Sequence, residues 1–120
     1  MHSITYEKLY DYFKNNWLDE NSFTTIRDIL RANGKLTSLR QRITAREHDR
    51  EEIYSRQEQL RANLTALQPT GNEATLRNRL LKDLESSQDK LDLIDAEIEQ
   101  AEKTIEATEQ SIDKMLEALH

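Results

Sequence analysis

The feature that most constrains this chain is a seven-residue repeat of apolar side chains in its last third. Apolar residues recur at intervals of seven at Leu84, Leu91, Ile98, Ile105, Ile112 and Leu119. Three residues after these positions stand Ser87, Ile94, Ala101, Thr108 and Met115. A straight helix of 3.6 residues per turn drifts away from such a repeat, so the pattern predicts a supercoiled helix over residues 73–119.

A second apolar seam with the same period lies upstream and predicts another long helix over residues 23–67. Its members are Ile29, Leu36, Leu39, Ile43, Ile53, Leu60, Leu64 and Leu67. Arg46, Arg50 and Gln57 interrupt the seam, and their long stems can cover apolar surface while their polar heads reach water. Asn33 and Gly34 could end a helix. The unbroken phase across them favours one continuous helix with a soft spot that costs about 1 kcal/mol relative to Ala.

Residues 68–72, Gln-Pro-Thr-Gly-Asn, contain the only Pro and one of the two Gly residues. This is the strongest breaker in the chain, and Thr70 or Asn72 can cap the helix that follows. Two helices of similar length joined by so short a connection favour antiparallel packing. Folding about residue 70 or 71 pairs apolar positions, namely Leu64 with Leu76, Leu60 with Leu80, Ile43 with Ile98, Leu36 with Ile105 and Ile29 with Ile112. We therefore predict an all-α fold, a long antiparallel coiled-coil hairpin over residues 22–120.

The distribution of charge supports this pairing. Residues 22–68 carry 9 basic and 6 acidic groups, whereas residues 72–120 carry 6 basic and 13 acidic groups. Opposite charges lower repulsion between the two helices and disfavour pairing of two acidic ones. Solvated charged faces are the alternative interpretation. A run of basic residues comprises Arg27, Arg31, Lys35, Arg40, Arg42, Arg46 and Arg50. It either faces the acidic helix or binds an acidic partner or RNA.

Aromatic side chains are concentrated in the first 23 residues, where six of the seven are found. Residues 1–21 are predicted to include a short amphipathic helix, followed by a turn at 19–22 in which Asn21 or Ser22 caps the next helix. This helix should pack across the open end of the hairpin, near Ile26, Leu30, Met115 and Leu119. Alternatively, its rings form a docking patch made of Tyr10, Phe13, Trp17 and Phe23.

Chemistry-bearing motifs are sparse, and we predict no catalytic, cofactor or metal site and no small-molecule substrate. The chain has no Cys, and its two Gly residues are isolated, which argues against thiolate metal sites and phosphate-binding loops. His48 and Glu52 are four residues apart and are interpreted as an exposed pair on an ion-rich helix. Glu117 and His120 have the Glu-x-x-His spacing of di-iron bundles, but the motif stands alone near a terminus.

Bulk properties limit the partners of the chain. A net charge of −6 argues against nucleic acid as the main partner, because phosphate binding favours a basic surface. The sequence has no apolar run of membrane-spanning length and does not begin with the pattern of a secretory signal. We therefore predict a cytoplasmic location without a membrane span.

Residues on both sides of the turn resemble a known family. Gln57, Leu60, Arg61, Asn63 and Leu64 match its pattern before the turn, and Leu80, Leu84 and Leu91 match the pattern after it. The pattern resembles the C-terminal helical hairpin of the mucoidy-inhibitor-like family of bacterial conserved proteins, although Gln59 stands where an Arg is usual. The resemblance implies a hairpin excised from a longer protein and implies no known catalysis.

These observations predict a structural coiled-coil module without enzymatic activity. Its expected role is self-association as a homodimer or docking of a protein partner. The alternative is a helical arm that binds RNA or a client protein.

Overall fold

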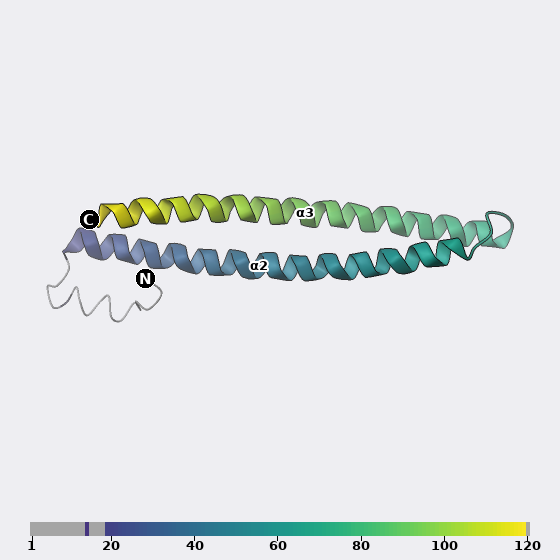
Figure 1. Cartoon of the computed structure of the whole chain (residues 1–120), viewed down its shortest axis with the longest axis horizontal. Helices are drawn as coiled ribbons and strands as arrows, with labels where there is room; N and C mark the ends of the chain where they lie inside the picture. Colours follow the sequence, from purple (N-terminus) through teal and green to yellow (C-terminus); the bar gives the residue numbers. More distant parts are fainter. Residues whose placement is uncertain (1–13, 15–18, 120) are drawn as a thin grey trace. The chain divides into compact units, whose positions relative to one another are not determined.

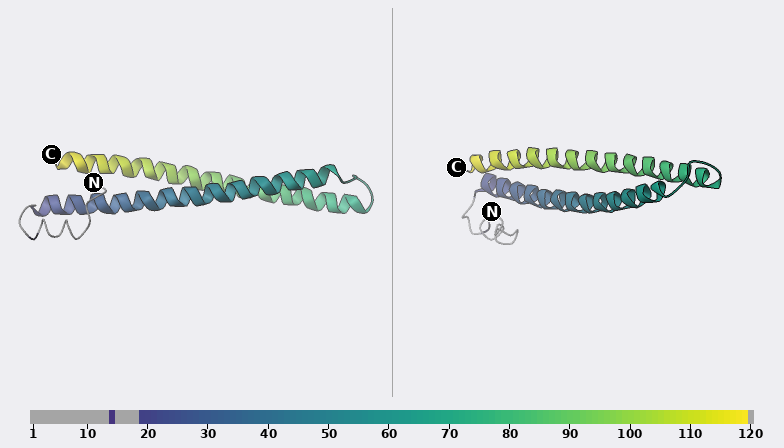
Figure 2. Two further views of the ribbon diagram at one scale, coloured as in Figure 1. Left: turned by 60° about the horizontal axis from the view of Figure 1, so that its bottom comes forward. Right: turned by 45° about the vertical axis from the view of Figure 1, so that its right-hand side comes forward.

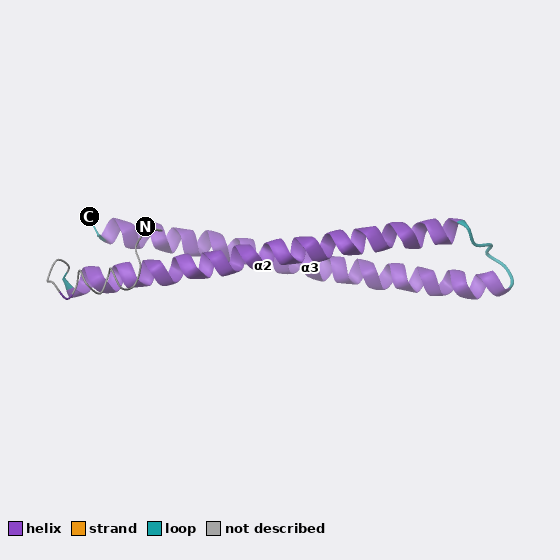
Figure 3. Ribbon diagram, turned by 90° about the horizontal axis from the view of Figure 1, so that it is seen from below, coloured by secondary structure: helices purple, strands orange, loops and turns teal. Residues whose placement is uncertain are grey.

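The computed structural model describes residue 14 and residues 19–119. Two long helices make up almost all of this part of the chain, α2 over Glu20–Thr65 and α3 over Asn72–Ala118. They pack against each other as a helical hairpin, running in opposite directions on either side of a short connection (Figure 1). The described residues contain helix and loop only (Figure 3). The predicted all-α hairpin is confirmed.

Asp19 begins α2. Its backbone carbonyl accepts a hydrogen bond from the N–H of Phe23 at 3.0 Å, and its carboxylate Oδ1 accepts one from the N–H of Ser22 at 2.7 Å. A side-chain oxygen at this position satisfies an N–H group that has no partner within the helix. The hydrogen bond from Ser22 lowers the pKa of Asp19 below its ordinary value of 3.8. The predicted caps Asn21 and Ser22 are wrong, because both residues lie inside the first turn of the helix.

The prediction of a helix continuous through Asn33 and Gly34 is confirmed, since α2 passes both residues without a break. Thr37 Oγ1 donates a hydrogen bond to the carbonyl oxygen of Asn33 at 3.2 Å, within the same helical segment. Nothing lies within 4 Å of the position that a Cβ atom would occupy at Gly34. This glycine is therefore a local weakness of the helix and not a packing requirement.

The connection between the helices comprises residues 66–71 (Figure 2). The N–H groups of Ala66 and Leu67 donate to carbonyl oxygens three residues back, at 3.2 Å each, which ends α2. Gly71 has a φ of 69°, a left-handed conformation that glycine adopts without steric cost. Across the turn, the Gln68 N–H donates to Glu73 Oε2 at 2.6 Å and holds the loop against the first turn of α3. The predicted reversal at Pro69–Gly71 is confirmed.

The chain forms two compact units. The first, which we call the terminal unit, combines the chain up to Arg42 with the chain from Ala101 onward, and the second, the turn unit, is Ile43–Gln100. Both contain a segment of α2 and a segment of α3. The predicted short helix within residues 1–21 falls almost entirely outside the described residues, as does its packing on the hairpin.

The terminal unit has an apolar core at the expected seam positions. Ile29, Leu36 and Ile112 are buried together, and Ile29 is fully inaccessible to solvent. Partly buried residues pack against them, namely Ala32, Ile105, Met115, Leu116 and Leu119. The two heptad patterns therefore meet in one core, as the sequence predicts.

The turn unit has buried leucines and isoleucines at Leu60, Leu64, Leu91, Ile94 and Ile98. Leu76, by contrast, is 44% exposed, and the neighbouring Arg77 donates from Nη1 to the carbonyl oxygen of Leu64 at 3.3 Å. Gln57 lies opposite Ser87, with their side chains hydrogen-bonded at 3.0 Å. One heptad closer to the turn, this register sets Leu64 opposite Leu80. The helices are thus displaced by about half a heptad from the predicted pairing in this unit.

Candidate interaction surface

Three polar residues of α2 interrupt the seam of the turn unit and contact α3 at that point. We call Arg46, Arg50 and Gln57, together with the α3 residues that they bind, the polar layers. In a heptad pattern such residues point toward the partner helix. Each of the three contacts a hydrogen-bonding or charged group of α3. Polar contacts therefore replace apolar packing at these positions of the seam.

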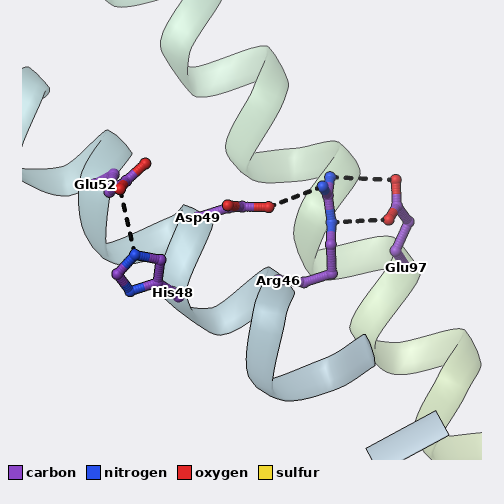
Figure 4. A network of polar contacts seen from close by, with 5 residues as sticks. All are labelled: Arg46, His48, Asp49, Glu52 and Glu97. Carbon is purple, nitrogen blue, oxygen red and sulfur yellow. Dashed lines mark hydrogen bonds and ion pairs between the residues drawn. The ribbon is translucent and has the colours of Figure 1, made fainter. Parts of the chain in front are cut away.

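Arg46 bridges the two helices (Figure 4). Its Nη2 atom donates a hydrogen bond to Glu97 Oε1 on α3 at 3.5 Å, and its Nε atom forms an ion pair with Glu97 Oε2 at 3.0 Å. Its Nη1 atom lies 3.0 Å from Asp49 Oδ2, one turn further along α2. The Arg46 side chain is 30% exposed, so its ion pairs are partly shielded from water. This geometry orients the arginine and links the helices.

Arg50 makes the neighbouring bridge. Its Nη1 atom donates to Asp95 Oδ1 at 3.0 Å, and Nη2 lies 3.9 Å from Glu47 Oε2 on its own helix. The hydrogen bond with Asp95 raises the pKa of the Arg50 guanidinium above its usual value. The side chains of Arg46 and Arg50 are each 30% exposed, and both guanidinium groups lie against carboxylates of the acidic helix.

Gln57 and Ser87 form the most buried polar layer, with exposed fractions of only 3% and 7%. Gln57 Nε2 donates to Ser87 Oγ at 3.0 Å, and Ser87 Oγ donates to the carbonyl oxygen of Leu84 at 2.7 Å. A buried amide or hydroxyl without a partner costs about 1–3 kcal/mol, so slipping the helices past one another would be penalised here. This layer specifies one antiparallel register.

Three residues of the basic run, Arg40, Arg46 and Arg50, form ion pairs with carboxylates of the acidic helix. Besides Arg46 and Arg50, Arg40 lies 3.6 Å from Glu109 in the terminal unit. Arg27 contacts Asp28 at 3.6 Å on its own helix. Charge complementarity between α2 and α3 is therefore expressed as specific ion pairs at three levels of the hairpin.

The two histidine candidates give no metal site among the described residues. His48 Nε2 lies 3.3 Å from Glu52 Oε1, and both side chains are mostly exposed, at 74% and 69% (Figure 4). Within the described part of the chain, no group of three His, Cys, Asp or Glu residues could hold a metal ion. His120, the second residue of the Glu117 motif, lies outside the described residues.

Of the predicted docking patch, only Phe23 is described, partly buried at the start of α2. Tyr10, Phe13 and Trp17 lie outside the described residues, so the patch stays a prediction. Neither α2 nor α3 has a segment long and apolar enough to cross a membrane.

A surface hollow of about 320 Å³ lies in the turn unit and was missed in the sequence analysis. Its apolar lining is Ile53 from α2 with Leu93 and Ile94 from α3, and Leu93 is 59% exposed. Its charged lining is Arg46, Asp49 and Glu52 from α2 and Lys90 from α3. We call this the Leu93 hollow. The sequence does contain a signal for this exposed leucine. Leu93 lies between the seam residues Leu91 and Ile94 but is itself out of phase with the heptad repeat.

The chain matches no protein-family model, no curated protein and no solved structure in the comparisons made. The resemblance to the mucoidy-inhibitor-like family thus stays a prediction.

Proposed function

We propose that this chain is a protein-interaction module that works by self-association through its helical hairpin. The proposal rests on one observation: the polar layers and the Leu93 hollow both lie in the turn unit. The layers fix α2 against α3 in one register, and the same segment leaves apolar side chains on its outer surface. A surface held rigid from within is suited to binding, because little ordering is needed on association.

The energetics of a two-helix hairpin also favour association. Two helices bury one narrow apolar stripe, and a domain of this size with so little core is marginally stable by itself. Four helices can share a core, as they do in bundles built from two hairpins. Besides Leu93, the exposed large apolar residues are Tyr54, Leu76 and Leu81. Association would remove part of this surface from water.

Sedimentation equilibrium of the full chain at micromolar concentrations tests the proposal. A monomer has a mass of 14.1 kDa. We expect the weight-average mass to rise with concentration toward twice that value. A mass that stays at the monomer value across the concentration series would contradict self-association.

A further inference from the structure

We propose that the Leu93 hollow is the surface by which one copy of this chain binds a second copy, hollow against hollow. This inference rests on the proposed self-association and adds the surface and the charge pairing that it uses. Three features of the turn unit carry it: an exposed apolar centre, charges of opposite sign on opposite helices, and the position of the hollow at the polar layers.

The apolar centre is provided by Leu93 and Ile53. Leu93 has the largest exposed fraction among the exposed large apolar side chains of the described residues, 59%. It is not isolated, because Ile53 from α2 and the buried Ile94 line the same hollow. A protruding leucine beside a recess is self-complementary when two copies meet about a two-fold axis, since each supplies a projection and a pocket.

The charges of the hollow are arranged with the same self-complementarity. On α2, Arg46 and Asp49 of the lining bind each other at 3.0 Å, which leaves the charge of Glu52 on α2 and that of Lys90 on α3. A two-fold axis parallel to the helices lays α3 of each copy over α2 of the other. Glu52 of each copy then faces Lys90 of the other, so the pair is formed twice, which favours this arrangement over one that superposes like charges.

The register of the hairpin places the opposing charges at the same level. Arg50 binds Asp95, and Gln57 binds Ser87, so Lys90 lies level with Tyr54 and within one turn of Glu52. In the two-fold arrangement, Lys90 of one copy faces Glu52 of the other. The carboxylates bound by Arg46, on Asp49 and Glu97, are already oriented within each copy.

The hollow lies beside the polar layers of the hairpin. Arg46 belongs both to the polar layers and to the lining of the hollow. A second copy would cover Leu93 and Ile53, in the manner of a four-helix bundle. A second copy is therefore the occupant to which both the shape and the charge of this surface are suited.

A leucine pair provides the first test. Leu93→Gln removes the apolar centre, while Leu81→Gln changes another exposed leucine of α3 that does not line the hollow. In sedimentation equilibrium of the full chain, we expect Leu93→Gln to raise the dimer dissociation constant at least about tenfold. Leu81→Gln should change it by no more than about twofold. Circular dichroism should show the same helix content in both variants.

A charge exchange provides the second test. Lys90→Glu and Glu52→Lys should each weaken the dimer, and the two substitutions combined should restore it, because the pairs between copies are re-formed with reversed sign. The effect should shrink in high salt.

The outcomes separate this inference from the proposed function. If the unmodified chain and Leu93→Gln dimerise equally well, the chain self-associates, but the Leu93 hollow is not the surface that it uses. A wild-type chain that stays monomeric overturns both. Failure of the combined charge variant to recover affinity would contradict the pairing of Lys90 with Glu52.

Discussion

The terminal unit and the turn unit use the same heptad geometry with different chemistry. In the terminal unit, Ile29, Leu36 and Ile112 form an apolar core. In the turn unit, buried leucines and isoleucines alternate with layers in which Arg46, Arg50 and Gln57 contact carboxylates or a hydroxyl. Apolar layers tolerate several registers, since one leucine contacts another equally well. Polar layers do not, because a displaced partner leaves a buried group unsatisfied.

The difference suggests a division of roles along the hairpin. Burial of apolar surface in the terminal unit supplies stability, and the polar layers of the turn unit supply register at some cost in stability. Substitutions in the two units should therefore differ in both size and character.

The largest effect is expected at Ile29, which is fully buried in the terminal unit. Ile29→Ala should lower the free energy of unfolding by about 2–5 kcal/mol, and the matched control Ile29→Val by about 0.5–1.5 kcal/mol. Urea denaturation followed by circular dichroism measures both. Equal effects of the two substitutions would show that Ile29 is not a core residue.

The next largest effect is expected at the buried polar layer. Gln57→Ala leaves Ser87 without its cross-helix partner and should cost about 1–3 kcal/mol of unfolding free energy. Replacing both partners, as Gln57→Leu with Ser87→Ala, should be neutral or stabilising, because no buried polar group is then stranded. Urea denaturation compares the variants. If the double variant is less stable than Gln57→Ala, the Gln57–Ser87 layer contributes net stability to the fold, and the claim that it only specifies the register is contradicted.

The two units show which parts of the fold the sequence alone predicts. Heptad spacing and a single strong breaker predict both helices and the reversal, because periodicity and turn propensity are local properties. Register is not local. The predicted pairing about residue 70 or 71 sets Gln57 opposite Asp83 or Leu84, whereas its side chain is hydrogen-bonded to Ser87. The polar residues on each helix could be identified separately, whereas the pairing of Gln57 with Ser87 requires the length of the turn.

The candidate surface shows the same limit. Leu93 is recognisable as a leucine out of heptad phase, yet its hollow depends on Ile53 and Lys90 reaching the same place from two helices. The cap at Asp19 was missed for a different reason. Asp19 and Ser22 both suit a helix start, and only the hydrogen bond from the Ser22 N–H decides between them.

A smaller pair of effects is expected at the two glycines, with opposite sign. Gly71 has a positive φ, so Gly71→Ala should cost about 1–2 kcal/mol of unfolding free energy. Gly34 lies inside α2 with open space around it, so Gly34→Ala should stabilise by about 1 kcal/mol. Thermal unfolding of both variants measures the difference. A stabilising Gly71→Ala would contradict the left-handed turn.

The smallest effect is expected at Asp19, which is fully exposed. The hydrogen bond from the Ser22 N–H lowers the pKa of Asp19 in the folded state, so the ionised carboxylate stabilises the fold. This stabilisation is fully present above pH 3.8, the ordinary pKa, and is lost as the pH falls through the lower pKa of the folded state. The pH dependence of the unfolding midpoint between pH 5 and acid conditions measures this. In Asp19→Asn that part of the dependence should disappear, and an unchanged profile would contradict the cap.

Disulfide trapping in the turn unit tests the central claim most directly, since the chain has no cysteine of its own. Gln57→Cys combined with Ser87→Cys should oxidise to an intramolecular cross-link at low protein concentration. Gln57→Cys combined with Leu80→Cys or Ile94→Cys, each one heptad away, should not. Equal or faster cross-linking of either displaced pair, or cross-links between chains only, would contradict an antiparallel hairpin held in this register.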